Sequence, residues 1–182
     1  TFTLNGHFGT LTVNKTTGVY TYAVNQANSQ VQGLAPGQTL SDVFNYTIED
    51  STSLSSSAKL TITINGANDA PTADSIPESS TVVEDLAGFV STGLLLNDPD
   101  LGAGANFALK LAASSGRLLV VDPAAAATAG VTIKGSDTGT LTLTGNMSDI
   151  TNWLQGDVIK YAAPPNVLGS NIATLTFSAN DG

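Results

Sequence analysis

The sequence predicts an all-β protein built as two tandem β-sandwich domains. Short runs in which apolar residues alternate with Thr or another polar residue recur along all 182 residues, and turns rich in Gly, Asn and Pro separate them. Helical periodicity is confined to two brief segments in the second half. Many short strands joined by such turns are typical of β-sandwiches.

The stretch at residues 65–71 divides the chain. A strictly alternating run over residues 59–64 leads into it, a glycine then interrupts that strand, and Pro71 cannot continue it because proline has no N–H and a fixed φ. We therefore expect one domain over residues 1–70 and a second domain over residues 71–182.

Alternation in the first domain predicts two hairpin strands around a polar turn at residues 14–18. A later strand ends at Asp50, and a Ser-rich loop at residues 51–57 separates it from the last strand. The strands expected in this domain cover residues 9–13, 19–24, 44–49 and 59–64. No helix is expected here.

The second domain is also expected to be mainly β. Its strands are predicted at residues 81–83, 94–96, 107–111, 118–121, 131–134, 140–144, 158–161 and 172–179. A helical turn at residues 122–130 has Asp122 as N-cap and Pro123 in its first turn. A second helical turn at residues 148–155 contains Trp153, which we interpret as a core residue; a sugar-binding platform is the alternative.

One pattern occurs twice. The alternating run at residues 44–50 and the run at residues 175–181 both end in aspartate. In the first copy a loop, a last strand and the stretch at residues 65–71 follow, which predicts that the second domain lacks its last strand and the first domain its first strands. We expect a segment of a tandem array.

The charge balance restricts the possible partners. Six basic and 15 acidic residues give a net charge of −9, so nucleic acid is not expected as a partner, because binding phosphates requires clusters of Lys and Arg. Divalent cations fit better, since they relieve repulsion between carboxylates. The absence of cysteine excludes disulfides, zinc–thiolate sites and cysteine nucleophiles. No apolar run is long enough for membrane insertion.

Residues 1–70 resemble the VCBS repeats of giant bacterial surface and secreted proteins. The motifs that carry the resemblance are GTLTV at residues 9–13, GVYTY at 18–22, GQTL at 37–40, DVFNYT at 42–47 and LTITINGANDAP at 60–71. Residues 71–182 resemble a bacterial cadherin-like domain, through VVED at residues 82–85, DPD at 98–100 and an aspartate late in the domain. The two together resemble the extender region of a type I-secreted RTX adhesin with Ig/cadherin-like β-sandwiches.

The cadherin resemblance implies a calcium site at the joint between the domains. In that family the linker, the Asp-x-Asp motif and the late aspartate share calcium with the preceding domain. The residues that match these positions are Asn68, Asp69, Asp98, Asp100 and Asp181. Local turns are the alternative for Asp69 and for the Asp98–Asp100 motif.

Two further acidic residues are candidate ligands. The resemblance places Glu84 at the far end of the second domain, facing a further domain. Asp42 opens a strand near the joint and is a candidate there; a solvated strand end is the alternative. Calcium takes six to eight oxygen ligands, and no single loop of this chain supplies that many, so ligands must come from distant segments. We expect one ion rather than three, because the first domain has no Asp-x-Glu pair.

The sequence therefore predicts a non-enzymatic extender module of a bacterial cell-surface adhesin, extracellular and stiffened by calcium. Its expected partners are neighbouring repeats, with host or cell-surface glycans or proteins contacted through other domains. A glycan- or ligand-binding domain that uses Trp153 or Tyr161 is the alternative. A hydrolase using Glu84 and Asp85 is the weakest hypothesis, since neither has a nucleophile or base to work with, and His7 is the only histidine.

Overall fold

The computed structural model describes residues 1–76, 79–83, 85–90, 93–102, 104–167 and 169–181. It divides into two compact units, unit 1 (Thr1–Asp69) and unit 2 (Ala70–Gly182). Strands hold 44% and helices 10% of the structure, which confirms the all-β class. No helix in the described part of the chain is long and apolar enough to cross a membrane.

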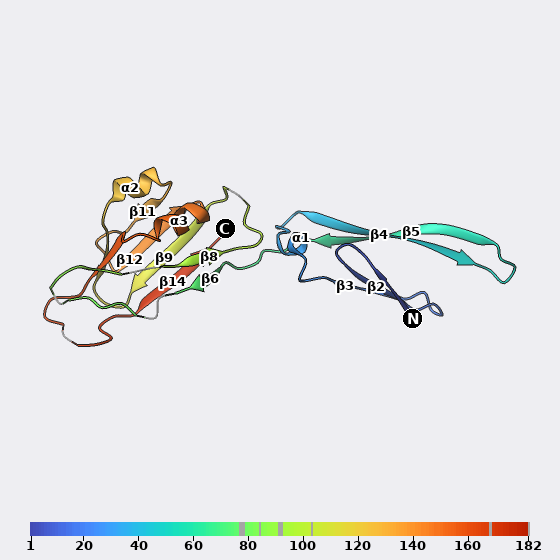
Figure 1. The fold of residues 1–182 in the computed structure, drawn as a ribbon, viewed down its shortest axis with the longest axis horizontal. Helices are drawn as coiled ribbons and strands as arrows, with labels where there is room; N and C mark the ends of the chain where they lie inside the picture. The colour runs from blue at the N-terminus through green and yellow to red at the C-terminus, as the bar shows by residue number, and fades with distance from the viewer. Residues whose placement is uncertain (77–78, 84, 91–92, 103, 168, 182) are drawn as a thin grey trace. The chain divides into compact units, whose positions relative to one another are not determined.

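Unit 1 contains two antiparallel sheets (Figure 1). Strands β1 (Phe2–Asn5), β2 (Gly9–Val13) and β3 (Tyr20–Val24) form one sheet in that order. Strands β4 (Thr39–Glu49) and β5 (Ser55–Asn65) form a long hairpin. The hairpin predicted around residues 14–18 is confirmed, because β2 pairs with β3.

Unit 1 departs from several predictions. Strand β1 was not predicted, and β4 begins at Thr39 rather than at residue 44. Residues 55–57 belong to β5 rather than to a Ser-rich loop, because they pair with the end of β4. A one-turn helix, α1 (Ser29–Gln32), was not expected. It forms because the Asn28 side chain accepts hydrogen bonds from the amides of Gln30 and Val31 and so caps the turn.

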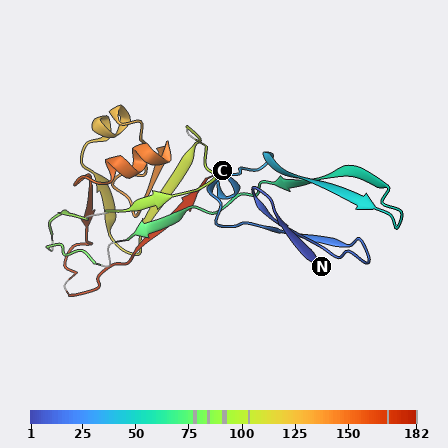
Figure 2. The same ribbon diagram turned by 45° about the vertical axis from the view of Figure 1, so that its right-hand side comes forward.

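The core of unit 1 covers the hairpin only at the start of β4 and the end of β5. Phe8, Leu34 and Ile64 form its buried cluster, and Phe44 on β4 is also buried. Farther along the same face, Tyr46 and Ile48 are exposed, and both ribbon views show β4 and β5 extending past the turn between β2 and β3 (Figures 1 and 2). Alternation therefore predicted the face of the strand correctly but not how far it is covered.

The described residues of unit 2 form three antiparallel sheets. The largest has the order β11 (Thr132–Lys134), β12 (Thr140–Gly145), β9 (Phe107–Ala113) and β14 (Leu175–Asn180). The second has the order β10 (Arg117–Val120), β13 (Ile159–Ala162) and β7 (Gly88–Phe89), and β6 (Thr72–Ser75) pairs with β8 (Leu95–Asn97). Two short helices, α2 (Pro123–Thr128) and α3 (Met147–Trp153), complete the unit.

One core joins the sheets of unit 2. Alternate residues of β9 and β12 point inward, and Leu111, Leu141 and Leu143 are fully buried. Helix α3 adds Ile150 and Trp153 to the same cluster. Trp153 is only 9% exposed, which confirms the interpretation of this residue as part of the core.

The predicted elements of unit 2 are mostly present, with shifted ends. Helix α2 starts where its cap predicted, because the Asp122 carboxylate accepts the amides of Ala124 and Ala125 at 2.9 Å each. Helix α3 starts one residue earlier than expected, since Asn146 is its N-cap. The strand predicted at residues 81–83 does not form, β14 begins only at Leu175, and β6 and β7 were not predicted.

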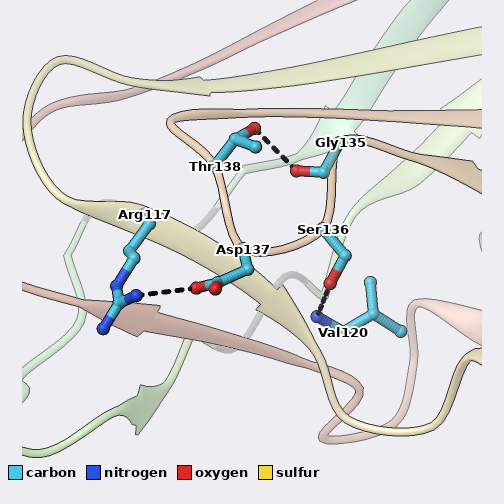
Figure 3. Close-up of polar contacts among 6 residues, drawn as sticks. All are labelled: Arg117, Val120, Gly135, Ser136, Asp137 and Thr138. Atoms are coloured by element: carbon cyan, nitrogen blue, oxygen red, sulfur yellow. Dashed lines mark hydrogen bonds and ion pairs between the residues drawn. The ribbon is translucent and has the colours of Figure 1, made fainter.

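The turn between β11 and β12 covers the outer edge of β10 (Figure 3). Leu118 on β10 exchanges two 2.7 Å backbone hydrogen bonds with the turn, donating to Thr138 and accepting from Asp137. The Ser136 hydroxyl accepts from the Val120 amide at 3.1 Å, and Arg117 pairs with Asp137 at 3.0 Å. This edge, at which a foreign strand could otherwise pair, is thereby occupied, and two sheets of the unit are tied together.

Thr138 shapes that turn, and we expect its hydroxyl to be important for stability. Its Oγ1 lies 2.7 Å from the carbonyl oxygens of both Gly135 and Thr140 and accepts from the Thr140 amide at 3.1 Å. Thr138→Ala should lower the free energy of unfolding of unit 2 by about 1–2 kcal/mol. The free energy of unfolding is measured by urea denaturation, with the fluorescence of Trp153 as the signal. The exposed Thr144→Ala on β12 is the matched control, and equal losses in both variants would contradict this role.

Candidate metal centre

The Asp98–Pro99–Asp100 motif follows directly on β8. Pairing of β6 with β8 sets Thr72 opposite Asn97, and the Thr72 hydroxyl donates to the Asn97 carbonyl at 3.2 Å. Pro99 cannot extend the strand. The Asp98 Oδ1 atom instead accepts the amides of Asp100 and Leu101, at 3.3 and 3.1 Å, and closes a tight turn.

Both carboxylates of this motif are buried. The local turn given as the alternative does form, but Asp98 and Asp100 are each only 7% exposed, so it is not a solvated surface turn. The Asp98 Oδ2 atom is buried and accepts no hydrogen bond from the described residues. Burial, a side-chain hydrogen bond with Asp100 and repulsion from Asp100 raise the pKa of Asp98. The pair therefore favours a shared proton or a bound cation.

Asp181 lies at the same end of unit 2. It follows β14, whose last residue, Asn180, is opposite Ala108 near the start of β9. The loop that carries Asp98 and Asp100 leads into that same start of β9. Among the described residues, however, no group of three or more His, Cys, Asp or Glu is arranged to hold a metal ion. The described residues thus bring Asp98 and Asp100 together, without a third carboxylate in an arrangement that could hold a metal ion.

The remaining predicted ligands are Asn68, Asp69, Glu84 and Asp42. Asn68 and Asp69 belong to unit 1, where the side-chain amide of Asn68 donates to the backbone carbonyl of Asp69 at 3.1 Å. That Asn68 and Asp69 share a metal ion with residues of unit 2 stays a prediction. Glu84 lies outside the described residues.

Asp42 lies in unit 1 and is 3% exposed, so the alternative of a solvated strand end is wrong. Its Oδ1 accepts the His7 amide at 2.8 Å, and its Oδ2 accepts the Phe8 amide at 3.0 Å and the Tyr22 hydroxyl at 2.5 Å. Gly6 leaves room for this carboxylate, since a Cβ atom there would collide with Oδ2. Asp42 therefore fastens the turn between β1 and β2 to β4. Its metal ligation stays a prediction.

The alternation of inward and outward residues along β4 could have revealed that Asp42 is a buried anchor. Asp42 lies between Leu40 and Phe44 on the face that alternation assigns to the core. An aspartate at an inward position must find donors, because an unpaired buried charge is costly. The sequence does not show which groups donate, because two of them come from a turn more than 30 positions earlier and the third, the Tyr22 hydroxyl, comes from β3.

The aromatic residues considered for glycan binding are part of the core. Trp153 is 9% and Tyr161 5% exposed, so neither ring can present a face to a sugar. This removes the residues on which the alternative of a ligand-binding domain depended.

Comparison of the chain with protein-family models, curated proteins and solved structures found no match. The case for a function therefore rests on the residues described above.

We expect Asp42→Ala to destabilise unit 1 by about 3 kcal/mol at pH 7, because it leaves three donors without their acceptor. Burial opposes ionisation of Asp42, but hydrogen bonds from Tyr22, Phe8 and His7 outweigh it and lower the pKa. A lowered pKa stabilises the fold above the pKa of the unfolded chain, about 3.9, and this contribution disappears as the pH falls further.

The difference between wild type and Asp42→Ala should therefore shrink below about pH 4. Hydrogen exchange of the β1–β5 amides isolates unit 1, since the single tryptophan lies in unit 2. Glu49→Ala, an exposed carboxylate on the same strand, is the control. A difference that is constant between pH 7 and pH 3 would count against the role of Asp42.

In buffer with a metal chelator, Asp98→Asn should stabilise unit 2 by on the order of 1 kcal/mol at neutral pH. The amide removes a buried charge and the repulsion from Asp100, which together disfavour the ionised Asp98. The change in the free energy of unfolding is measured by urea denaturation, with Trp153 fluorescence as the signal. Asp122→Asn is the control, because asparagine also caps helices. A variant less stable than wild type would show that the charge on Asp98 stabilises the fold without metal.

Proposed function

We propose that the chain is a non-enzymatic extender module of a large bacterial cell-surface adhesin, made of two tandem Ig/cadherin-like β-sandwich domains and stiffened by calcium. One observation carries the proposal: the buried Asp98 Oδ2 atom, beside the buried carboxylate of Asp100, accepts no hydrogen bond from the described residues. A carboxylate in that state is stabilised by a cation.

The oxygen atoms that this pair offers as metal ligands suit calcium. Carboxylate oxygens are hard ligands, which calcium and magnesium prefer, and the chain has no cysteine to favour a softer metal. Calcium tolerates irregular geometry, so the two aspartates can be completed by backbone carbonyls and water. Asp181 is the first candidate for a further carboxylate, because it lies at the same end of unit 2.

The location of the pair supports a mechanical role. Thr72 is opposite Asn97, so the segment by which the chain enters unit 2 runs beside Asp98. An ion held there would limit the motion of that segment, whereas a short linker without metal is free to bend. A chain without disulfides needs another such staple outside the cell.

The internal repeat supports a tandem array. Residues 44–49 end β4 and residues 175–180 form β14, and in each copy the strand stops one residue before an aspartate, Asp50 or Asp181. Two β units that share a strand pattern are what repetition of one module produces. Neighbouring repeats are accordingly the first expected partners, in a secreted protein held at the cell surface.

Calcium should raise the stability of unit 2, by about 2.7 kcal/mol at a hundredfold excess over its dissociation constant. Urea denaturation with calcium or with chelator measures this, and calorimetry gives the affinity. Asp98→Asn should abolish the response, whereas Asp122→Asn should retain it, since Asp122 only caps α2. An unresponsive wild type, or an equal response in Asp98→Asn, would refute the site.

Solution scattering separates binding from stiffening. We expect the radius of gyration to rise with calcium in the wild type and to stay constant in Asp98→Asn. If calcium binds and stabilises unit 2 but leaves the radius unchanged, the site holds and the extender mechanism fails.

A further inference from the structure

The outward face of the largest sheet carries a regular polar array. Residues that alternate with the core positions on β11, β12, β9 and β14 align across the strands in three rows. The first row is Thr132, Thr144, Ala108 and Asn180; the second is Lys134, Thr142, Lys110 and Ser178; the third is Thr140, Ala112 and Thr176. We call these positions the threonine–lysine face.

This face has the opposite charge to the rest of the chain. Lys110 and Lys134 are both exposed, and none of the four strands contains an Asp or Glu. The chain has only six basic residues and a net charge of −9. Asp137, in the turn after β11, is paired with Arg117 of another sheet. Two of the six cations therefore lie on strands that contain no carboxylate.

The two lysines have a defined spacing. They share the second row and are separated by Thr142 on the intervening strand. Adjacent strands lie about 4.8 Å apart, so the two backbone positions are roughly 10 Å apart across the sheet. Hydroxyl groups lie beside both lysines, and the small residues Ala108 and Ala112 lie on either side of Lys110 along β9.

We propose that the threonine–lysine face binds an extended, negatively charged polysaccharide, a polymer of uronic acids. Lysine ammonium groups pair with its carboxylates, and Thr and Ser hydroxyls exchange hydrogen bonds with sugar hydroxyls. Threonine methyl groups supply contact with the C–H surfaces of the rings. The inference is independent of the proposed calcium site, which involves other residues.

Other polyanions fit this face less well. Nucleic acid would require more cations and aromatic rings for base stacking, and none of the four strands presents an aromatic residue outward. A membrane surface would require outward apolar side chains to insert, and the face offers only alanine and threonine methyl groups. A sugar chain matches both the hydroxyls and the modest charge.

Ionic strength provides one signature. At physiological salt the Debye length is about 8 Å, so distant carboxylates of the chain are screened while the two lysines still act on a ligand in contact. Binding should weaken further as salt increases, because the ion pairs are exposed.

Titration of the whole chain with an oligomannuronate hexasaccharide tests the proposal. Calorimetry and amide chemical shifts would be recorded in chelator, so that calcium plays no part. We expect saturable binding, with shifts on β9, β11, β12 and β14. Lys110→Gln should weaken it about fivefold or more, and Lys110→Arg should retain it. Binding should fall between about 50 and 300 mM salt.

Lys160→Gln is the matched control, because it removes the same charge from another sheet of unit 2, where Lys160 stands over Phe89. It should leave affinity unchanged. Equal weakening by Lys160→Gln would show a non-specific charge effect and overturn the proposal. So would equal binding of a neutral maltohexaose, binding to anionic vesicles but not to the uronate, or the absence of saturable binding.

Discussion

Burial of one face of each antiparallel strand is the constraint on which the rest of this structure depends. Because successive side chains alternate, a strand that packs one face against a core must present the other to solvent. In β9 and β12 this places leucines and Phe107 inside and threonines and Lys110 outside. The same rule turns Asp42 inward beside Phe44, where it must be given donors. The two-residue periodicity of the strands therefore accounts for the buried core, for the inward position of Asp42 and for the polar outward face of the largest sheet.

Closing the sheets requires more than periodicity. Strand β10 would present a free edge, and the turn between β11 and β12 occupies it through the Leu118 backbone and the Ser136 hydroxyl. The hairpin of β4 and β5 shows the contrasting case, since Tyr46 and Ile48 remain exposed although they continue the buried face of Phe44. Coverage of a strand is decided by the elements that pack on it, and those are set at long range.

This distinction explains what could be predicted. Strands with strong alternation, such as β2, β4, β9 and β12, were predicted from local pattern, and so was the cap of α2 at Asp122. Short strands such as β6 and β7 were missed because pairing partners rather than propensity create them. For the candidate site, sequence identified Asp98 and Asp100 as a pair. The sequence could not show that these two carboxylates are buried. Nor could it show that the donors for Asp42 come from the turn before β2 and from Tyr22 on β3.

Asp42 and Asp98 show how environment assigns different roles to one chemical group. Both are almost fully buried. Asp42 receives three neutral donors distributed over both oxygens, and its pKa is lowered. The two amides that Asp98 receives reach one oxygen only, its neighbour is another carboxylate, and its pKa is raised. A carboxylate satisfied by fixed dipoles gains little from a cation, whereas one that faces a second carboxylate gains a great deal. Among the buried aspartates of the described residues, the physical case for calcium is therefore strongest at Asp98 and Asp100.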